Sequence, residues 1–181
     1  ESFKDLVVDL NVDLPDLQVK KLQDNKIDIL FARKPINKEF FNFEPLKIDK
    51  FIVMASTKHP LANKRISLKD LNNYNWAIST TAKQTQELFF NLFSSKDLPT
   101  PKISFSTNSL NVALNSLLNS SLLLFTTDNT LERFKSEKFC KIEIKDFEVS
   151  RQTGVITRQG YTSIFLDSLI KNLKRLMKEE N

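Results

Sequence analysis

The sequence predicts an α/β fold, in which buried strands alternate with amphipathic helices. An apolar run at Ile27 and residues 29–31 has the length of a strand that is covered on both faces. Farther along, residues 86–93 and 110–118 repeat apolar side chains at helical spacing, and a short apolar segment precedes each of them. Strands that alternate with helices in this way form a sheet with helices packed on its faces.

The first predicted elements are a strand, a helix and a second strand. Residues 7–12 alternate weakly between apolar and polar types, which indicates a strand. Asp13 or Asp16 can cap the helix that follows, and Asn25 ends it in the place that glycine usually fills. Residues 27–32 form the next strand, so a right-handed crossover would make the two strands parallel. The apolar face of the helix consists of Leu14, Leu17 and Leu22.

The same alternation continues to the end of the chain. Pro35 and Pro45 prevent a long helix through the aromatic segment 40–46. A turn at His59-Pro60 and a helix start at Ser67 come next, and residues 140–147 lead back toward the first part of the chain. Further strands are predicted at 49–56, 76–78, 103–105, 122–125 and 155–157, and further helices at 86–93, 110–118, 127–134 and, capped by Ser163, 163–177.

Two polar loops, at residues 79–85 and 106–109, each connect a predicted strand to a predicted helix. They place hydroxyl groups and backbone N–H groups at a helix N-terminus, which carries partial positive charge and favours anions. Their Ser, Thr and Asn side chains also suit simple helix capping, and both interpretations are open.

The sequence shows no arrangement of residues that would indicate an enzyme. His59 is the single histidine, so a catalytic base or metal ligand would lack a second histidine, and a structural turn residue is the favoured interpretation. There is no Ser/His/Asp or Cys/His arrangement, no glycine-rich phosphate loop and no metal-ligand spacing. We therefore expect no catalytic residues, no cofactor and no metal.

Composition sets further bounds on the class of protein. The chain has 181 residues, 40% of them hydrophobic, which suffices for one ordinary core or two small lobes. It carries one cysteine, no apolar run of membrane-spanning length and no visible secretory signal, so a cytoplasmic protein is expected. The net charge of +5 fits nucleic-acid binding or a lysine-rich proteome, and the scattering of lysines among acids favours the second.

One ordered set of motifs resembles a known family. The set contains Leu22, Ile27-Asp28-Ile29, the strand 51–56, His59-Pro60-Leu61-Ala62 and Ile66-Ser67-Leu68-Lys69-Asp70-Leu71. In this order the motifs resemble the effector-binding domain of LysR-type transcriptional regulators, and the resemblance extends to about Leu176.

The resemblance implies a type 2 periplasmic-binding-protein fold, with two Rossmann-like lobes joined by two crossover strands. Lobe I would contain residues 1–48 and 149–181, and lobe II residues 49–148. Strands 27–32 and 155–157 would lie in lobe I, and 51–56 and 103–105 in lobe II, rather than all four in one continuous sheet. Two departures stand out: the first strand of lobe I has no counterpart, and Ser120-Ser121 replace the usual Gly-x-Gly step.

The implied function is to sense a small effector in the cleft between the lobes. The effector would be an anion, with a carboxylate favoured because an arginine can grip it through two hydrogen bonds. An alternative is that Arg33 pairs with an internal acid such as Glu44. By resemblance, the ligand-binding residues are Arg33, Thr81, Gln84, Thr85, Asn108 and Ser109.

The resemblance also implies partners. The chain would form a homodimer or tetramer, and it would contact DNA only through an N-terminal helix-turn-helix that is not part of this sequence. A transport-type solute-binding protein of the same fold is the alternative function.

Overall fold

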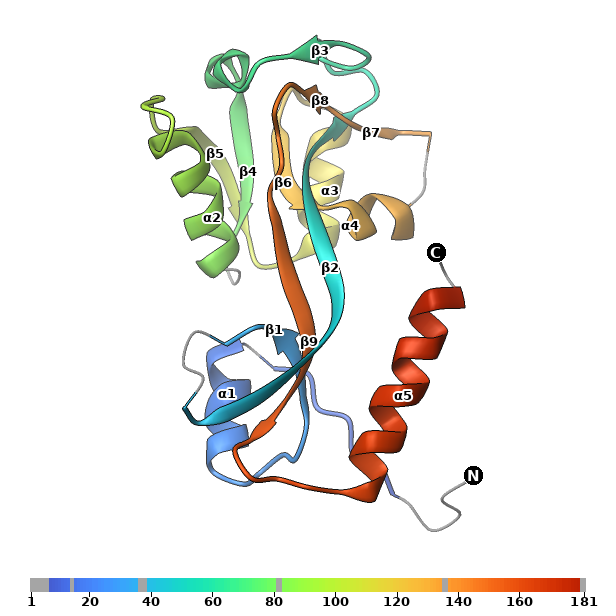
Figure 1. Ribbon diagram of the computed structural model, residues 1–181. Helices are drawn as coiled ribbons and strands as arrows, with labels where there is room; N and C mark the ends of the chain where they lie inside the picture. The colour runs from blue at the N-terminus through green and yellow to red at the C-terminus, as the bar shows by residue number, and fades with distance from the viewer. Residues whose placement is uncertain (1–6, 14, 36–38, 81–82, 135–136, 180–181) are drawn as a thin grey trace. The chain divides into compact units, whose positions relative to one another are not determined.

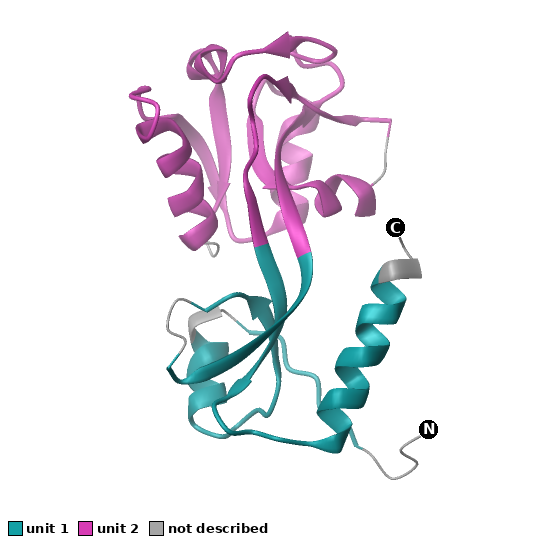
Figure 2. Ribbon diagram, viewed as in Figure 1, with its two compact units in different colours: residues 1–47, 152–181 teal, residues 48–151 magenta. Residues whose placement is uncertain are grey.

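The computed structural model describes residues 7–13, 15–35, 39–80, 83–134 and 137–179 (Figure 1). These residues divide into two compact units, one of residues 1–47 and 152–181 and the other of residues 48–151 (Figure 2). We call them unit 1 and unit 2. Within the residues described, no helix has the length and apolar composition needed to cross a membrane.

Unit 1 is built around a small apolar core. It contains α1 (Pro15–Gln23), β1 (Leu30–Arg33), the first part of β2 (Phe41–Ser56), most of β9 (Ser150–Arg158) and α5 (Ile164–Glu179). Leu22, Leu30, Phe41 and Ile156 are buried together in this core. Beyond α1, Asn25 has a φ of 59°, which confirms the prediction that it replaces a helix-ending glycine.

The predicted strand at residues 7–12 is wrong. The described part of this segment has no regular structure, and Val7 and Val12 are 90% and 88% exposed. A strand forms only beside a partner, and β1 pairs in antiparallel fashion with β9 rather than in parallel with this segment. The predicted parallel pair of strands is therefore wrong as well, and Leu14 lies outside the described residues.

Unit 2 contains a sheet with both parallel and antiparallel strand pairs. Its strands lie in the order β2-β6-β4-β5, with β7 (Phe139–Lys141) on the other side of β2. β4 (Asn75–Ser79) is parallel to β5 (Lys102–Thr107) and to β6 (Leu123–Thr127), whereas β2 is antiparallel to β6. The remaining elements are β3 (Arg65–Ile66), η1 (Leu68–Asn73), α4 (Asp128–Arg133) and β8 (Glu143–Ile144).

Helices cover both faces of this sheet, as the sequence periodicity predicted. Val53 and Phe125 belong to the cluster that contains the buried side of α2 (Lys83–Ser94). Met54 and Leu124, one residue along in each strand, belong to the cluster that contains α3 (Leu110–Leu118). Because neighbouring side chains in a strand point to opposite faces, α2 and α3 pack on opposite sides of the sheet.

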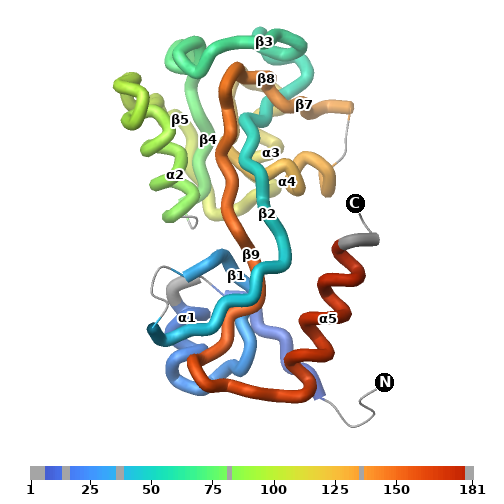
Figure 3. Tube along the Cα trace, in the orientation of Figure 1, coloured from blue at the N-terminus to red at the C-terminus, as the bar shows by residue number. Residues whose placement is uncertain are grey.

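Two long strands connect the units. β2 has 16 residues and β9 has nine, and each includes residues of both units (Figure 2). Both strands can be followed along the chain trace in Figure 3. Hydrogen-bonded neighbours therefore run in one order, β1-β9-β2-β6-β4-β5. The four strands divide between the units as expected, with 27–32 and 155–157 in unit 1 and 51–56 and 103–105 in unit 2. The unbroken order of pairing was not expected, and it arises because β2 and β9 each include residues of both units.

Candidate functional site

The carboxyl ends of β4 and β5 bring the two polar loops to one edge of the unit 2 sheet. The strands are parallel, with Ser79 opposite Thr107, and the Thr80 N–H donates to the Thr107 carbonyl at 2.9 Å. In open α/β sheets, ligands bind at such an edge. The helices that follow the loops, α2 and α3, lie on opposite faces of the sheet.

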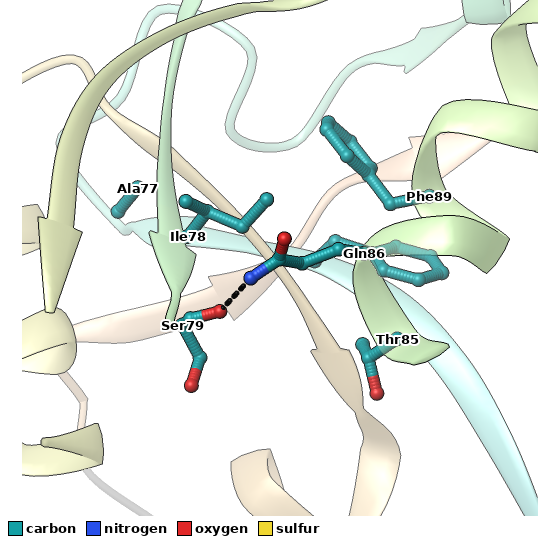
Figure 4. Close-up of a pocket in the computed structure, with 7 residues that line it drawn as sticks. Ala77, Ile78, Ser79, Thr85, Gln86 and Phe89 are labelled. Atoms are coloured by element: carbon teal, nitrogen blue, oxygen red, sulfur yellow. Dashed lines mark hydrogen bonds between the residues drawn. The ribbon is translucent and has the colours of Figure 1, made fainter. Parts of the chain in front are cut away.

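A pocket lies on the α2 side of this edge. It holds about 280 Å³ of space, part of which is open to solvent, and Ala77, Ile78, Ser79, Thr85, Gln86, Phe89 and Phe125 line it. Gln86 extends from α2 toward the end of β4, where its Nε2 donates to the Ser79 carbonyl oxygen (Figure 4). The pocket thus combines apolar side chains with a few polar groups, which is the usual composition of a small-molecule site.

The apolar part of the pocket is continuous with the core of unit 2. The Phe89 and Phe125 ring centroids lie 5.5 Å apart, and Trp76 packs against Phe89 with an edge-to-face geometry at 4.6 Å. Trp76 is 1% exposed, and it is the single tryptophan of the sequence. A change in the surroundings of Phe89 should therefore alter the fluorescence of Trp76, which packs against it.

The structure brings only part of the predicted ligand set to this pocket. Thr85 lines it, whereas Gln84 is half-buried in the first turn of α2 and does not. Asn108 is exposed, and Ser109 caps α3 by accepting a hydrogen bond from the Val112 N–H at 3.4 Å. Thr81 lies outside the described residues.

Arg33 belongs to unit 1, where it lies opposite Thr153 in the β1–β9 ladder. Glu44, which the sequence offered as a partner for Arg33, forms an ion pair with Lys174.

Sequence reasoning missed Arg151, which lies beside the pocket. Its Nε donates to Asp49 Oδ2 at 3.2 Å, and its Nη1 donates to Thr85 Oγ1 at 3.3 Å. The guanidinium carbon lies 5.1 Å from the centre of the Phe51 ring, which in turn stacks on Phe125 at 4.7 Å. These partners are distant in sequence, so local patterns could not have found the cluster.

His59 has a structural role, as predicted. Its Nδ1 accepts from the Leu61 N–H at 3.1 Å, and its Nε2 lies 3.2 Å from the Ser121 carbonyl oxygen, which requires a proton on Nε2. Burial lowers the pKa of His59, and the bond to Ser121 opposes that shift. The neutral ring therefore connects the turn after β2 to the loop before β6.

The Ser120-Ser121 loop has an ordinary backbone in place of the glycine step. Neither serine has a positive φ, and Ser120 Oγ donates to the Ser116 carbonyl at 2.6 Å while accepting from the Leu122 N–H at 3.2 Å. Together with the contact from His59 to Ser121, these hydrogen bonds hold the loop in place before β6 without a glycine.

Cys140 is the single cysteine of the sequence. Cys140 is half-buried, its Sγ donates to the Ser56 carbonyl at 3.6 Å, and burial raises its pKa, which keeps it a thiol. Across the residues that the structure describes, no cluster of His, Cys, Asp and Glu could hold a metal ion.

Comparison with known proteins places this chain in a family. The family profile described as the LysR substrate binding domain matches residues 1–178. The chain therefore belongs to the LysR substrate binding domain family and has the type 2 periplasmic-binding-protein fold. Regulatory domains of this family are generally not enzymes, and a transport-type solute-binding protein is not favoured. No curated protein matches the chain.

Solved structures show the same fold at low sequence identity. The Synechocystis PCC6803 CcmR regulatory domain in complex with 2-PG aligns with a TM-score of 0.77 and 20% identity, over 88% of this chain and 78% of that one. The effector-binding domain of QuiR in complex with shikimate gives 0.74 and 16%, over 92% and 79%. The BenM effector-binding domain with benzoate gives 0.75 and 18%, over 92% and 76%.

Proposed function

We propose that this chain senses a small anionic effector for a LysR-type transcriptional regulator, and that the unit 2 pocket takes part in binding it. The observation that carries the proposal is a pocket at the carboxyl end of β4, with apolar walls and polar groups on α2. Family membership supports a ligand-binding role. The likeness to domains solved with 2-PG, shikimate and benzoate supports an acidic ligand.

The proposal extends to the predicted ligand residues and lobes. Units 1 and 2 would be the two lobes, and Thr85 would contact the effector directly. Arg33, Gln84, Asn108 and Ser109 remain predicted contacts, as does Thr81. A ligand that favours one arrangement of the protein over another would shift the population between them, and this shift is the signal.

Partners form the next part of the proposal. The regulator would act as a homodimer or tetramer in the cytoplasm and would bind DNA through a helix-turn-helix domain. Light scattering at tens of micromolar should give a mass above that of the monomer. A monomer mass alone at that concentration would contradict the dimer.

A ligand panel tests the effector directly. The panel contains benzoate, shikimate and other small acids, each matched with its amide or alcohol, and calorimetry measures binding. Because Trp76 packs on Phe89, ligand entry should also change the tryptophan emission. Binding of acids but not of their neutral counterparts is the expected result. A panel in which only neutral compounds bind would overturn the anionic effector, and a panel without any binding would overturn the sensing function.

Arg33 is tested in the same experiment. Losing a charged hydrogen bond to the ligand should weaken binding of the best acid to Arg33→Ala by about ten- to hundredfold. Unchanged affinity would remove Arg33 from the site and leave the unit 2 residues to account for binding.

A further inference from the structure

We infer that Arg151 is the charge anchor of the unit 2 pocket, and that the pocket takes a small monocarboxylate with an apolar body. This inference rests on the proposed effector-binding function and deepens it by assigning the residue that recognises the acid. Arg151 lies in β9, outside the segments that the sequence singled out for ligand contact.

The first argument is position. Thr85 lines the pocket, and Arg151 Nη1 is 3.3 Å from its hydroxyl oxygen. A ligand oxygen that reaches the Thr85 hydroxyl is therefore within reach of the guanidinium. Because Arg151 donates to Oγ1, Thr85 acts as the acceptor in that bond and can give its own proton to a ligand oxygen.

The second argument is how the guanidinium is held. Asp49, which is 8% exposed, fixes Nε, and the Phe51 ring lies under the guanidinium plane. Arginine has five N–H donors, and the two bonds to Asp49 and Thr85 use two of them. The side chain is still 30% exposed, so an oriented cation with donors to spare borders the pocket.

The third argument is the shape and polarity of the pocket. Ile78, Phe89 and Phe125 form apolar walls, and the polar groups come from Ser79, Thr85 and Gln86. The space between these groups is open to solvent on one side, so a ligand can reach them from outside. Apolar walls beside a cation favour a ligand with an apolar body and one carboxylate, which would reach Thr85 and Arg151. A multiply charged, fully polar ligand would leave the apolar walls unused.

A structural role for Arg151 is the competing explanation, because its contacts with Asp49 and Thr85 also brace β2, β9 and α2. The two roles predict opposite effects at Asp49. If Arg151 anchors the ligand, Asp49→Asn keeps an amide oxygen that can accept from Nε but removes the competing negative charge, so benzoate should bind more tightly. If Arg151 only braces the unit, Asp49→Asn and Arg151→Gln break the same ion pair and should weaken binding alike.

The test is calorimetric titration of benzoate and its neutral counterpart benzamide into the whole chain. We expect benzoate to bind Arg151→Gln at least tenfold more weakly than wild type, which corresponds to about 1.4 kcal/mol. Asp49→Asn should bind benzoate more tightly. Thr85→Val, which keeps the side-chain shape but loses the hydroxyl, should also weaken benzoate binding. Arg133→Gln is the matched control, since it removes an exposed arginine of the same unit and should change nothing.

Each outcome decides the inference. Equal benzoate affinity for wild type and Arg151→Gln, or parallel losses in Arg151→Gln and Asp49→Asn, would overturn it while the sensing function stands. Benzamide binding as tightly as benzoate would overturn it in the same way. If neither compound binds and the wider panel also fails, the proposed function fails too. If Arg151→Gln does not fold, the opposite shifts expected for Asp49→Asn and Thr85→Val decide.

Discussion

Gly154 is the position where the two crossover strands leave no room for a side chain. A Cβ atom at this position would lie 2.1 Å from the carbonyl oxygen of Glu44 and 3.0 Å from its carbonyl carbon. The obstacle is backbone rather than a flexible side chain, so β9 would have to move away from β2. The backbone of Gly154 does not use the positive-φ region, so only the lack of space opposes alanine.

The expected cost of Gly154→Ala follows from these distances. Overpacking against fixed neighbours costs about 1–3 kcal/mol, and backbone overlap places this case at the upper end. Alanine restricts the unfolded chain, which offsets about 0.4–1 kcal/mol of that cost. We therefore expect a net loss of about 2 kcal/mol in the free energy of unfolding. For a chain of this size, the melting temperature should fall by about 4–8 °C.

Thermal denaturation followed by circular dichroism measures this loss, and Gly160 provides the control. Gly160 has a φ of 76° and nothing within 4 Å of its Cβ position, so it is opposite to Gly154 in both respects. Gly160→Ala should cost about 1 kcal/mol through backbone strain, and Gly160→Asn should cost less because asparagine tolerates that conformation. Wild-type stability of Gly154→Ala would refute the close approach of the two strands.

Two further predictions concern stability. Burial lowers the pKa of folded His59 below its usual 6.5, so the unfolded chain binds the proton more readily. The contribution of His59 to the free energy of unfolding is therefore complete above about pH 6.5 and is lost as the pH falls through the pKa of the folded state. Urea titrations across this pH range should show the loss in wild type but not in His59→Asn. Arg158 donates to the carbonyls of Leu22 and Ile27 at 3.1 and 2.6 Å and pairs with Asp28, so Arg158→Ala should lower the free energy of unfolding by about 1.5–3 kcal/mol.

Each of these predictions has a clear contrary result. The same loss of stability below pH 6.5 in His59→Asn would assign the pH dependence to other groups. For Arg158, the exposed Arg175→Ala serves as the control in unit 1, and Arg158→Lys keeps the charge but loses the forked geometry. If Arg158→Ala is no less stable than Arg175→Ala, Arg158 does not hold the end of α1.

Local features of the fold could be predicted from the sequence because their causes are local. Asn25 ends α1 at a positive φ, and His59 forms the turn after β2. The spacing of apolar residues in α2 and α3 also predicted that each helix buries one face, and Phe89 and Leu114 are buried there. Each of these predictions depends on residues a few positions apart, where helix geometry and turn chemistry decide the outcome.

The errors and omissions concern contacts between distant segments. The strand predicted at residues 7–12 has the right residue types but no partner in the described ladders. Arg151 is 102 residues from Asp49 and 66 from Thr85, so only the folded sheet brings the three together. Among the predicted ligand residues, Thr85 reaches the pocket because α2 packs on the face that carries Phe125, whereas Ser109 starts a helix on the other face.

Chemical-shift mapping tests the central claim, that the unit 2 pocket binds a small carboxylate. The ¹⁵N-labelled chain is titrated with benzoate, and amide and arginine side-chain resonances are followed. We predict the largest shifts at Ser79, Thr85, Gln86 and the Arg151 Nε–H, with smaller shifts at Phe89 and at the Trp76 indole. Shifts confined to residues outside this pocket, or none at benzoate concentrations that saturate binding in calorimetry, would contradict the account.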